Sequence, residues 1–401
     1  MASVTDDDGP RQLRRRKVAI MGVALSDCGR VDDATTPYTL HAQAARRALA
    51  DAGLEHTAVD GLASAGLGTL APVEVAEYLG LRPTWVDSTS VGGSTWEVMA
   101  AHAADAIAAG HANVVLLVYG STARADIKAG RRTGNLSFGA RGPLQFEVPY
   151  GHTLIAKYAM AARRHMHEYG TTLEQLASVA VQARANAASN PEAMFRTPIT
   201  VDDVLSSPPI ADPFTKLHCC IRSDGGAAVL LAAEEYVRDC RPATPVWILG
   251  TGEHVSHTTM SEWPDFTTSP AAISGRLAFE RAGVQPSEID FAEIYDAFTY
   301  MTLVTLEDLG FCAKGEGGAF VEKNRLTLTG DLPVNTDGGG LSAQHPGMRG
   351  IFLLVEAVRQ LRGEAGQHQL HTPTGSLPHL AVASGTGGWF CSSGTVVLGR
   401  G

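Results

Sequence analysis

The sequence is poor in cysteine and has no excess of positive charge. Six cysteines occur among the 401 residues, at positions 28, 219, 220, 240, 312 and 391. None forms a C-x-x-C pair or has the spacing of a His/Cys metal site, so we expect neither a zinc site nor a disulfide framework. The formal net charge is −10. A nucleic-acid-binding surface is therefore not expected, because neutralising phosphates requires a basic face.

Long hydrophobic runs are also missing. No apolar run approaches the length that spans a bilayer, and no apolar signal region precedes the first expected strand. We therefore expect no membrane association and, together with the unpaired cysteines, a cytoplasmic protein. The acidic and then basic stretch at 1–16 is expected to be a disordered N-terminal tail.

What is present indicates an α/β enzyme. Hydrophobic residues make up 44% and charged residues 18%, as in ordinary globular proteins. Short apolar segments alternate with helical patterns along the first part of the chain, which predicts parallel βα units. The expected strands lie at 17–23, 59–65, 85–90 and 113–119, and the expected helices lie at 40–52 and 95–109.

The pattern then changes and returns. Residues 121–220 are richer in Arg, His, Tyr and Asn, and we interpret them as a mostly helical inserted domain. The segment 221–244 contains the apolar run AAVLLA and is expected to rejoin the N-terminal half, which begins at 17 and runs to 120. Residues 245–401 form the expected C-terminal half.

The C-terminal half repeats the theme of the N-terminal half. PVWILG at 245–250 resembles KVAIMG at 17–22, and AFERAGVQPSEIDFA at 278–292 matches ALADAGLEHTAVDGL at 48–62 without a gap. Two matches in the same order predict a duplicated βα unit. Two equivalent helix N-termini should then converge, and such ends favour an oxyanion.

Three C-terminal segments carry the candidate chemistry. DFAEIYDAFTY at 290–300 alternates like a strand and runs directly into a helical pattern, which places a Tyr and an Asp at the rim of the sheet. NTDGGGLSAQHPGMRG at 335–350 contains one His, and SGTGG at 384–388 is a Gly-rich segment expected to be a loop.

These motifs, in this order, resemble the thiolase superfamily, most closely its lipid-transfer-protein or sterol-carrier-protein branch, over about residues 17–401. The resemblance implies a duplicated, layered α-β-α-β-α core with a helical loop-domain insertion. The family's nucleophilic Cys falls on Ser90, its Asn-Glu-Ala-Phe Asn on Tyr295, and its Gly-His-Pro His on His345. Its second Cys falls at about Ser384.

Both family cysteines are therefore replaced, which removes the acyl-carrying thiolate and the proton-shuttling thiolate. A subgroup that also lacks the Cys and has Tyr in place of the Asn consists of aldolases that cleave β-hydroxyacyl-CoA, for example in steroid side-chain degradation. The resemblance thus implies retro-aldol cleavage of a β-hydroxyacyl-CoA. An acyltransferase or condensing enzyme using Ser90, and a non-catalytic acyl-CoA-binding subunit, remain open alternatives.

For the aldolase, Tyr295 and His345 are the expected acid/base pair. Backbone N–H groups are expected to supply an oxyanion hole or acyl contact, with Ser90 contributing its backbone rather than a nucleophile. Those positions are Ser90, Ser384, Gly385, Thr386 and Gly387. Coenzyme A enters as part of the substrate, and no bound cofactor or metal is expected. Weaker candidates for pairing with its phosphates are Arg124, Arg131 and Arg132. The resemblance also implies a homodimer and an OB-fold partner protein.

Overall fold

The computed structural model describes residues 16–65, 68, 70–131, 142–151, 153–239 and 244–401. The predicted tail at 1–16 falls almost entirely outside these residues. In the N-terminal half the elements are β1 (Val18–Leu25), α1 (Pro37–Ala52), β2 (Gly61–Ala63), α2 (Ala71–Leu79), β3 (Trp85–Asp87), α3 (Thr95–Ala108) and β4 (Val114–Ser121). The insertion then carries α4 (Ala123–Lys128), α5 (Leu154–Tyr169), α6 (Leu173–Ala188), α7 (Val201–Leu205) and the short strands β5 (Pro209–Ala211) and β6 (Phe214–Thr215).

The chain returns to the core with β7 (Gly225–Ala233) and α8 (Glu234–Asp239). The C-terminal half contains β8 (Val246–Val255), α9 (Ala271–Ala282), β9 (Phe291–Ile294), α10 (Thr299–Asp308), α11 (Gly317–Phe320), α12 (Gly339–Ser342), α13 (Gly350–Arg362), β10 (Leu380–Gly387) and β11 (Ser392–Arg400). The predicted division at 121, 220 and 245 stays a prediction.

The main sheet has the strand order β3-β2-β4-β7-β1-β8-β11-β10-β9. Counted outward from the centre, the strands β1-β7-β4-β2 of one half correspond to β8-β11-β10-β9 of the other. The two halves meet where β1 and β8 pair through only Ala19–Trp247 and Ile20–Val246. The sheet is mixed: β2 is parallel to β3 and β4, and β9 to β10, whereas the strands next to the seam are antiparallel. The strands predicted as parallel βα units, β1 to β4, all run in one direction, and β7, which is antiparallel to both β4 and β1, lies between those two strands.

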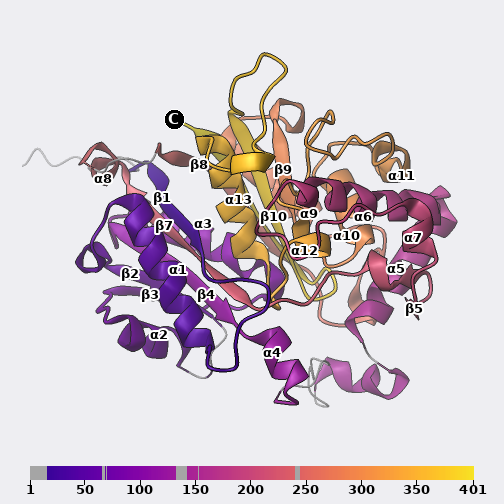
Figure 1. Ribbon diagram of the computed structural model, residues 1–401, viewed down its shortest axis with the longest axis horizontal. Coiled ribbons are helices and arrows are strands. Elements are labelled where there is room, and N and C mark those ends of the chain that lie inside the picture. Colours follow the sequence, from indigo (N-terminus) through magenta and orange to yellow (C-terminus); the bar gives the residue numbers. More distant parts are fainter. Residues whose placement is uncertain (1–15, 66–67, 69, 132–141, 152, 240–243) are drawn as a thin grey trace, which may run out of the picture.

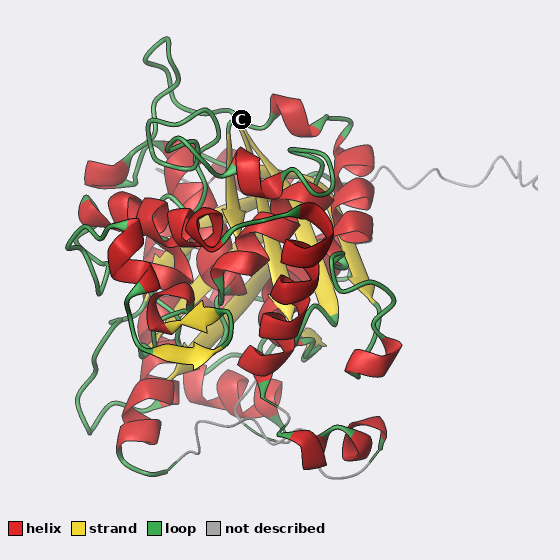
Figure 2. Cartoon of the chain, turned by 90° about the vertical axis from the view of Figure 1, so that its right-hand side faces the viewer, coloured by secondary structure: helices red, strands yellow, loops and turns green. Residues whose placement is uncertain are grey.

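The helices make layers around these two half-sheets (Figure 1). α1 packs on β1, β7 and β4 on one outside face, and α9 packs on β8 and β11 on the other. α3 and α13 lie between the half-sheets and contact strands of both. Figure 2 shows the strands enclosed by helices in the perpendicular view. The predicted layered, duplicated α/β core is confirmed.

Equivalent glycines make equivalent close contacts in the two halves. On β1, a Cβ added at Gly22 would lie 2.1 Å from the carbonyl oxygen of Ala48 on α1. On β8, a Cβ at Gly250 would lie 2.2 Å from the carbonyl oxygen of Ala278 on α9. Both helices end in a glycine of positive φ, Gly53 at 67° and Gly283 at 71°. Each half therefore needs a glycine on its first strand so that its first helix can approach.

We expect Gly22→Ala and Gly250→Ala each to destabilise the fold by about 1–3 kcal/mol, because the added methyl group meets backbone that cannot move aside. Denaturant unfolding followed by circular dichroism measures the loss. The control is Gly283→Asn, since Asn accepts a positive φ and nothing lies within 4 Å of the added Cβ. Ordinary surface substitutions change stability by less than about 0.5 kcal/mol. A loss below about 0.5 kcal/mol in both alanine variants would contradict this packing.

Three local predictions need correction. The helix α2 was not predicted, although its buried side chains Ala71 and Val75 recur at helical spacing. The strand expected at 85–90 ends at Asp87, so Ser90 lies in the following turn. The Gly-rich segment 384–388, expected to be a loop, continues β10 up to Gly387, and only Gly388 belongs to the turn.

Candidate active site

Tyr295 lies immediately after β9, where the chain leaves the sheet. Its backbone N–H donates to the Ser384 carbonyl oxygen on neighbouring β10 at 3.0 Å. The side chain is buried, and its ring lies against Gly93, where an added Cβ would come within 2.4 Å of the ring atoms Cε2 and Cζ. Burial raises the pKa of the Tyr295 phenol well above its usual value. The phenol is therefore uncharged at neutral pH and can donate a hydrogen bond.

His345 lies between α12 and α13 and faces Tyr295. The ring centroids are 5.5 Å apart and the planes meet at 84°, an edge-to-face arrangement. The His345 backbone N–H donates to Ser223 Oγ at 2.9 Å, which fixes this part of the loop. Nε2 is buried and has no hydrogen-bond partner among the described residues. Burial lowers the pKa of His345 to about 4, so the imidazole is neutral and able to accept a proton.

The turn that precedes α3 and the end of β10 complete this region. A Cβ at Gly92 would lie 2.8 Å from the Gly387 Cα, and one at Gly93 would lie 2.3 Å from the Thr386 carbonyl oxygen. The two backbones therefore approach as closely as glycine permits. The sequence-predicted segments 90–93 and 384–387 are thus brought together beside Tyr295. Their role as an oxyanion hole stays a prediction.

Two serine side chains in these segments point elsewhere. Ser90 is exposed, in the turn before α3. Ser384 Oγ lies 3.1 Å from Thr395 Oγ1, which in turn lies 2.9 Å from Ser274 Oγ on α9. Gly385, one residue later, faces the opposite side of β10 and lies against α3. The contribution expected from Ser384 therefore rests on its backbone, not on its hydroxyl group.

The weaker arginine candidates already have acidic neighbours. Arg124 lies 4.0 Å from Asp224, and Arg131 donates to Asp126 at 2.9 Å. Arg132 lies outside the described residues. The structure gives no reason to prefer these side chains, so the coenzyme A contacts stay a prediction. Among the residues described, no group of His, Cys, Asp and Glu side chains is arranged to hold a metal ion.

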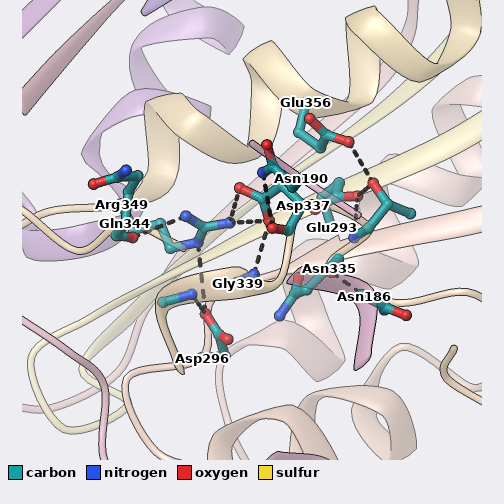
Figure 3. Close-up of polar contacts among 12 residues, drawn as sticks. Asn186, Asn190, Glu293, Asp296, Asn335, Asp337, Gly339, Gln344, Arg349 and Glu356 are labelled. Atoms are coloured by element: carbon teal, nitrogen blue, oxygen red, sulfur yellow. Dashed lines mark hydrogen bonds and ion pairs between the residues drawn. The ribbon is translucent and has the colours of Figure 1, made fainter. Parts of the chain in front are cut away.

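A buried ion network supports the His345 loop, and the sequence did not reveal its central member. Arg349 is fully buried; its Nη2 donates to both oxygens of Asp337, at 2.6 and 2.8 Å, and its Nη1 donates to the Gln344 carbonyl oxygen at 2.9 Å (Figure 3). Its Nε lies 3.6 Å from Asp296 Oδ1. The only signal in the sequence was an arginine next to the apolar run GIFLLV, which gave no indication of its partners.

Asp296 connects this network to Tyr295, its neighbour in the chain. Its carboxyl group accepts from the backbone N–H groups of Gly340 at 2.7 Å and Leu341 at 3.2 Å. Burial raises the pKa of Asp296 to about 7, although Arg349 opposes the shift. Asp296 thus ties the segment after β9 to the loop that carries His345.

Comparisons with known proteins fit this geometry. Residues 252–400 match the family model described as Thiolase C-terminal domain-like. The 17-hydroxy-3-oxo-4-pregnene-20-carboxyl-CoA lyase of Mycobacterium tuberculosis is 34% identical over 92% of this chain and 97% of its own. This chain belongs to the thiolase superfamily. Within it, the sequence places the chain in the lipid-transfer, aldolase-like branch, as predicted.

Two further similar proteins carry the names of two different activities. A solved structure called Ltp2-ChsH2(DUF35) aldolase superposes with a TM-score of 0.85 at 32% identity, covering 97% of this chain and 99% of its own. An acetyl-CoA acetyltransferase of Methanothermobacter thermautotrophicus is 33% identical over 93% of this chain and 97% of its own. Overall identity is therefore similar for a lyase and for a transferase, and the residues of the site must decide between them.

Proposed function

We propose that this protein cleaves a β-hydroxyacyl-CoA by a retro-aldol reaction, with Tyr295 and His345 as its acid/base pair. The observation that carries the proposal is the buried contact between a neutral phenol and a neutral imidazole in a chain that lacks both of the family's cysteines. The names of the lyase and aldolase relatives support the same chemistry.

The reaction needs no covalent intermediate. His345 Nε2 takes the proton of the β-hydroxyl group, and the bond between the α and β carbons breaks, giving a ketone or aldehyde and a thioester enolate. Tyr295 and the backbone N–H groups near Ser90 and Gly387 stabilise the enolate oxygen. The proton then returns to the α carbon. The net change is one proton moved from oxygen to carbon, so no co-reactant is consumed.

The test is a panel of β-hydroxyacyl-CoAs, including one with a steroid acyl group, followed by mass spectrometry. The proposal predicts equal amounts of carbonyl product and shortened acyl-CoA without added free coenzyme A. The second candidate is an acyltransferase acting through Ser90, favoured by the acetyltransferase relative. It predicts instead an acyl group on Ser90 and a requirement for a second acyl acceptor.

The pH dependence should reveal the state of His345. Because its pKa is lowered to about 4, the imidazole stays a free base down to that pH. We expect kcat/KM to fall on the acid side only near pH 4, which a pH–rate profile over the range where the protein stays folded would measure. A midpoint near the ordinary histidine value of 6.5 would contradict the buried, neutral imidazole.

A partner subunit forms the last part of the proposal. The name of the aldolase structure joins two proteins, Ltp2 and ChsH2(DUF35). We propose that this chain likewise acts with a small OB-fold partner and as a homodimer. Co-expression with an OB-fold protein, taken from the same locus where one is encoded there, followed by size-exclusion chromatography with light scattering, tests both assemblies. Full activity from this chain alone, as a monomer, would contradict them.

A further inference from the structure

A buried carboxyl group lies on α3, a helix that packs against strands of both halves of the sheet. Glu97 is in the first turn of α3, and its side chain is about 1% exposed. Neither carboxyl oxygen has a hydrogen-bond partner among the described residues. An unpaired buried carboxylate is among the most costly arrangements in a protein, and a neutral carboxylic acid is far less so. The position therefore calls for an explanation.

Three glycines make room for this side chain. A Cβ at Gly385 on β10 would lie 2.1 Å from Glu97 Oε2, and a Cβ at Gly350, the first residue of α13, would lie 2.5 Å from the same oxygen. A Cβ at Gly394 on β11 would lie 2.8 Å from the Glu97 Cβ. The carboxyl group thus fills the gap between the starts of α3 and α13. The sequence predicted that these helix N-termini converge there and suit an oxyanion.

The same carboxyl group is one step from the proposed acid/base pair. The Gly93 carbonyl oxygen lies 2.4 Å from the position of a Cβ on Gly350, so it shares that gap with Glu97 Oε2. Gly93 in turn lies directly against the Tyr295 ring. Both oxygens are acceptors within 2.5 Å of the same point, so a proton on the carboxyl group would let it donate to the carbonyl. A charged carboxylate would repel both that carbonyl and a developing enolate.

We propose that Glu97 is a positioning residue for the retro-aldol reaction: as an uncharged acid it holds the Gly93 turn against the Tyr295 ring. This inference rests on the proposed function and adds a residue that acts through Gly93 and Tyr295. Loss of its proton would place a negative charge close to the enolate, and would lower turnover.

The neighbouring groups determine the pH at which Glu97 loses its proton. Burial raises the pKa of Glu97 to about 8. The titratable or charged groups around this end of α3 and α13 are the Tyr295 and Tyr119 phenols, the His345 imidazole and Arg349. Arg349 is paired with Asp337 and Asp296, burial keeps the Tyr295 phenol neutral by raising its pKa, and His345 loses its charge near pH 4. β10 and β11 present glycines and hydroxyl groups there. Of these groups Glu97 is expected to titrate near pH 8, and Asp296, whose pKa is about 7, titrates below it.

The test combines infrared spectroscopy with kinetics. The difference spectrum between the wild type and Glu97→Gln should contain the carbonyl band of a protonated carboxyl group at pH 6, and the band should fade as the pH rises through about 8. Glu356→Gln is the matched control: Glu356 is also buried, but a hydrogen bond to His368 helps to lower its pKa to about 2 against the effect of burial. Its difference spectrum should lack the band.

Turnover should follow the same proton. The wild-type kcat should fall above pH 8, whereas Glu97→Gln, with a permanently neutral amide, should lose this alkaline decline. Glu97→Ala should lower kcat by about 10-fold or more at pH 7 with a smaller effect on KM, because the Gly93 turn is no longer held. Glu97→Gln should keep most of the kcat that Glu97→Ala loses, because the amide group can also donate a hydrogen bond to the Gly93 turn.

Each result of these experiments supports or overturns either the role of Glu97 or the proposed function. Absence of the carboxyl band at pH 6 would overturn the inference, as would an alkaline decline that persists in Glu97→Gln. Failure of every β-hydroxyacyl-CoA to react would overturn the proposed function, whereas the infrared titration would still show whether Glu97 holds its proton. If Glu97→Ala does not fold, the Gln variant and the infrared titration still test the inference.

Discussion

Tyr295→Phe should lower kcat by about 10²–10⁴-fold, the usual effect of losing one positioned acid or base. The substitution removes a single oxygen from a buried ring, and the ring itself continues to pack against Gly93 and His345. The loss should therefore appear in turnover rather than in folding. Steady-state kinetics with the best substrate of the panel, together with a thermal melt, measures both quantities.

A matched tyrosine makes this prediction specific. Tyr300 is also fully buried, five residues further along the chain, and its hydroxyl group donates to the Phe266 carbonyl oxygen at 2.9 Å. Tyr300→Phe should cost about 1 kcal/mol of stability through that lost hydrogen bond and leave kcat nearly unchanged. If both variants behave alike, Tyr295 is a packing residue and its assigned role is wrong.

The largest effect on stability is expected from Arg349→Met. Removing the guanidinium group leaves the buried carboxyl groups of Asp337 and Asp296 without their cation (Figure 3). Breaking a buried ion pair from one side usually costs about 3–5 kcal/mol. Urea unfolding should show this loss. Turnover should also fall in the folded fraction, because the Gln344 carbonyl group beside His345 loses its donor.

An exposed arginine provides the comparison. Arg276 pairs with Glu280 on the surface of α9, and both side chains are more than half exposed. Arg276→Met should change stability by less than about 0.5 kcal/mol, as exposed pairs contribute little. In the buried network, adding Asp337→Asn to Arg349→Met should recover part of the loss. Exposed ion pairs contribute at most about 1 kcal/mol to stability. A loss below about 1 kcal/mol for Arg349→Met alone would show that the carboxyl groups find other partners.

The sequence predicted those features that local pattern determines. The apolar period predicted β1 to β4 and the helices α1 and α3, and the matched segments at 48–62 and 278–292 predicted the duplication. Gly22 and Gly250 then proved to have equivalent contacts in the two halves. The pairing of Tyr295 with His345 followed from the order of the motifs in a resembled family, not from physical reasoning on single residues.

What the sequence did not predict depends on contacts between distant segments. Nothing local distinguishes Arg349 or Glu97 from a surface charge, because their partners come from other elements. The end of β10 was expected to be a loop since three of its residues at 384–388 are glycine. In the structure, two of these glycines allow α3 and its preceding turn to approach, so small residues there reflect close packing rather than a turn.

The central claim is that one phenol and one imidazole act together in the cleavage step. A double-mutant cycle tests it most directly, with kcat measured for the wild type, Tyr295→Phe, His345→Ala and the double variant on the same β-hydroxyacyl-CoA. We predict that each single variant loses activity and that the double variant is scarcely slower than the slower single one, since groups acting as a unit are not additive. Independent, multiplying losses, or a single variant with wild-type turnover, would contradict the claim.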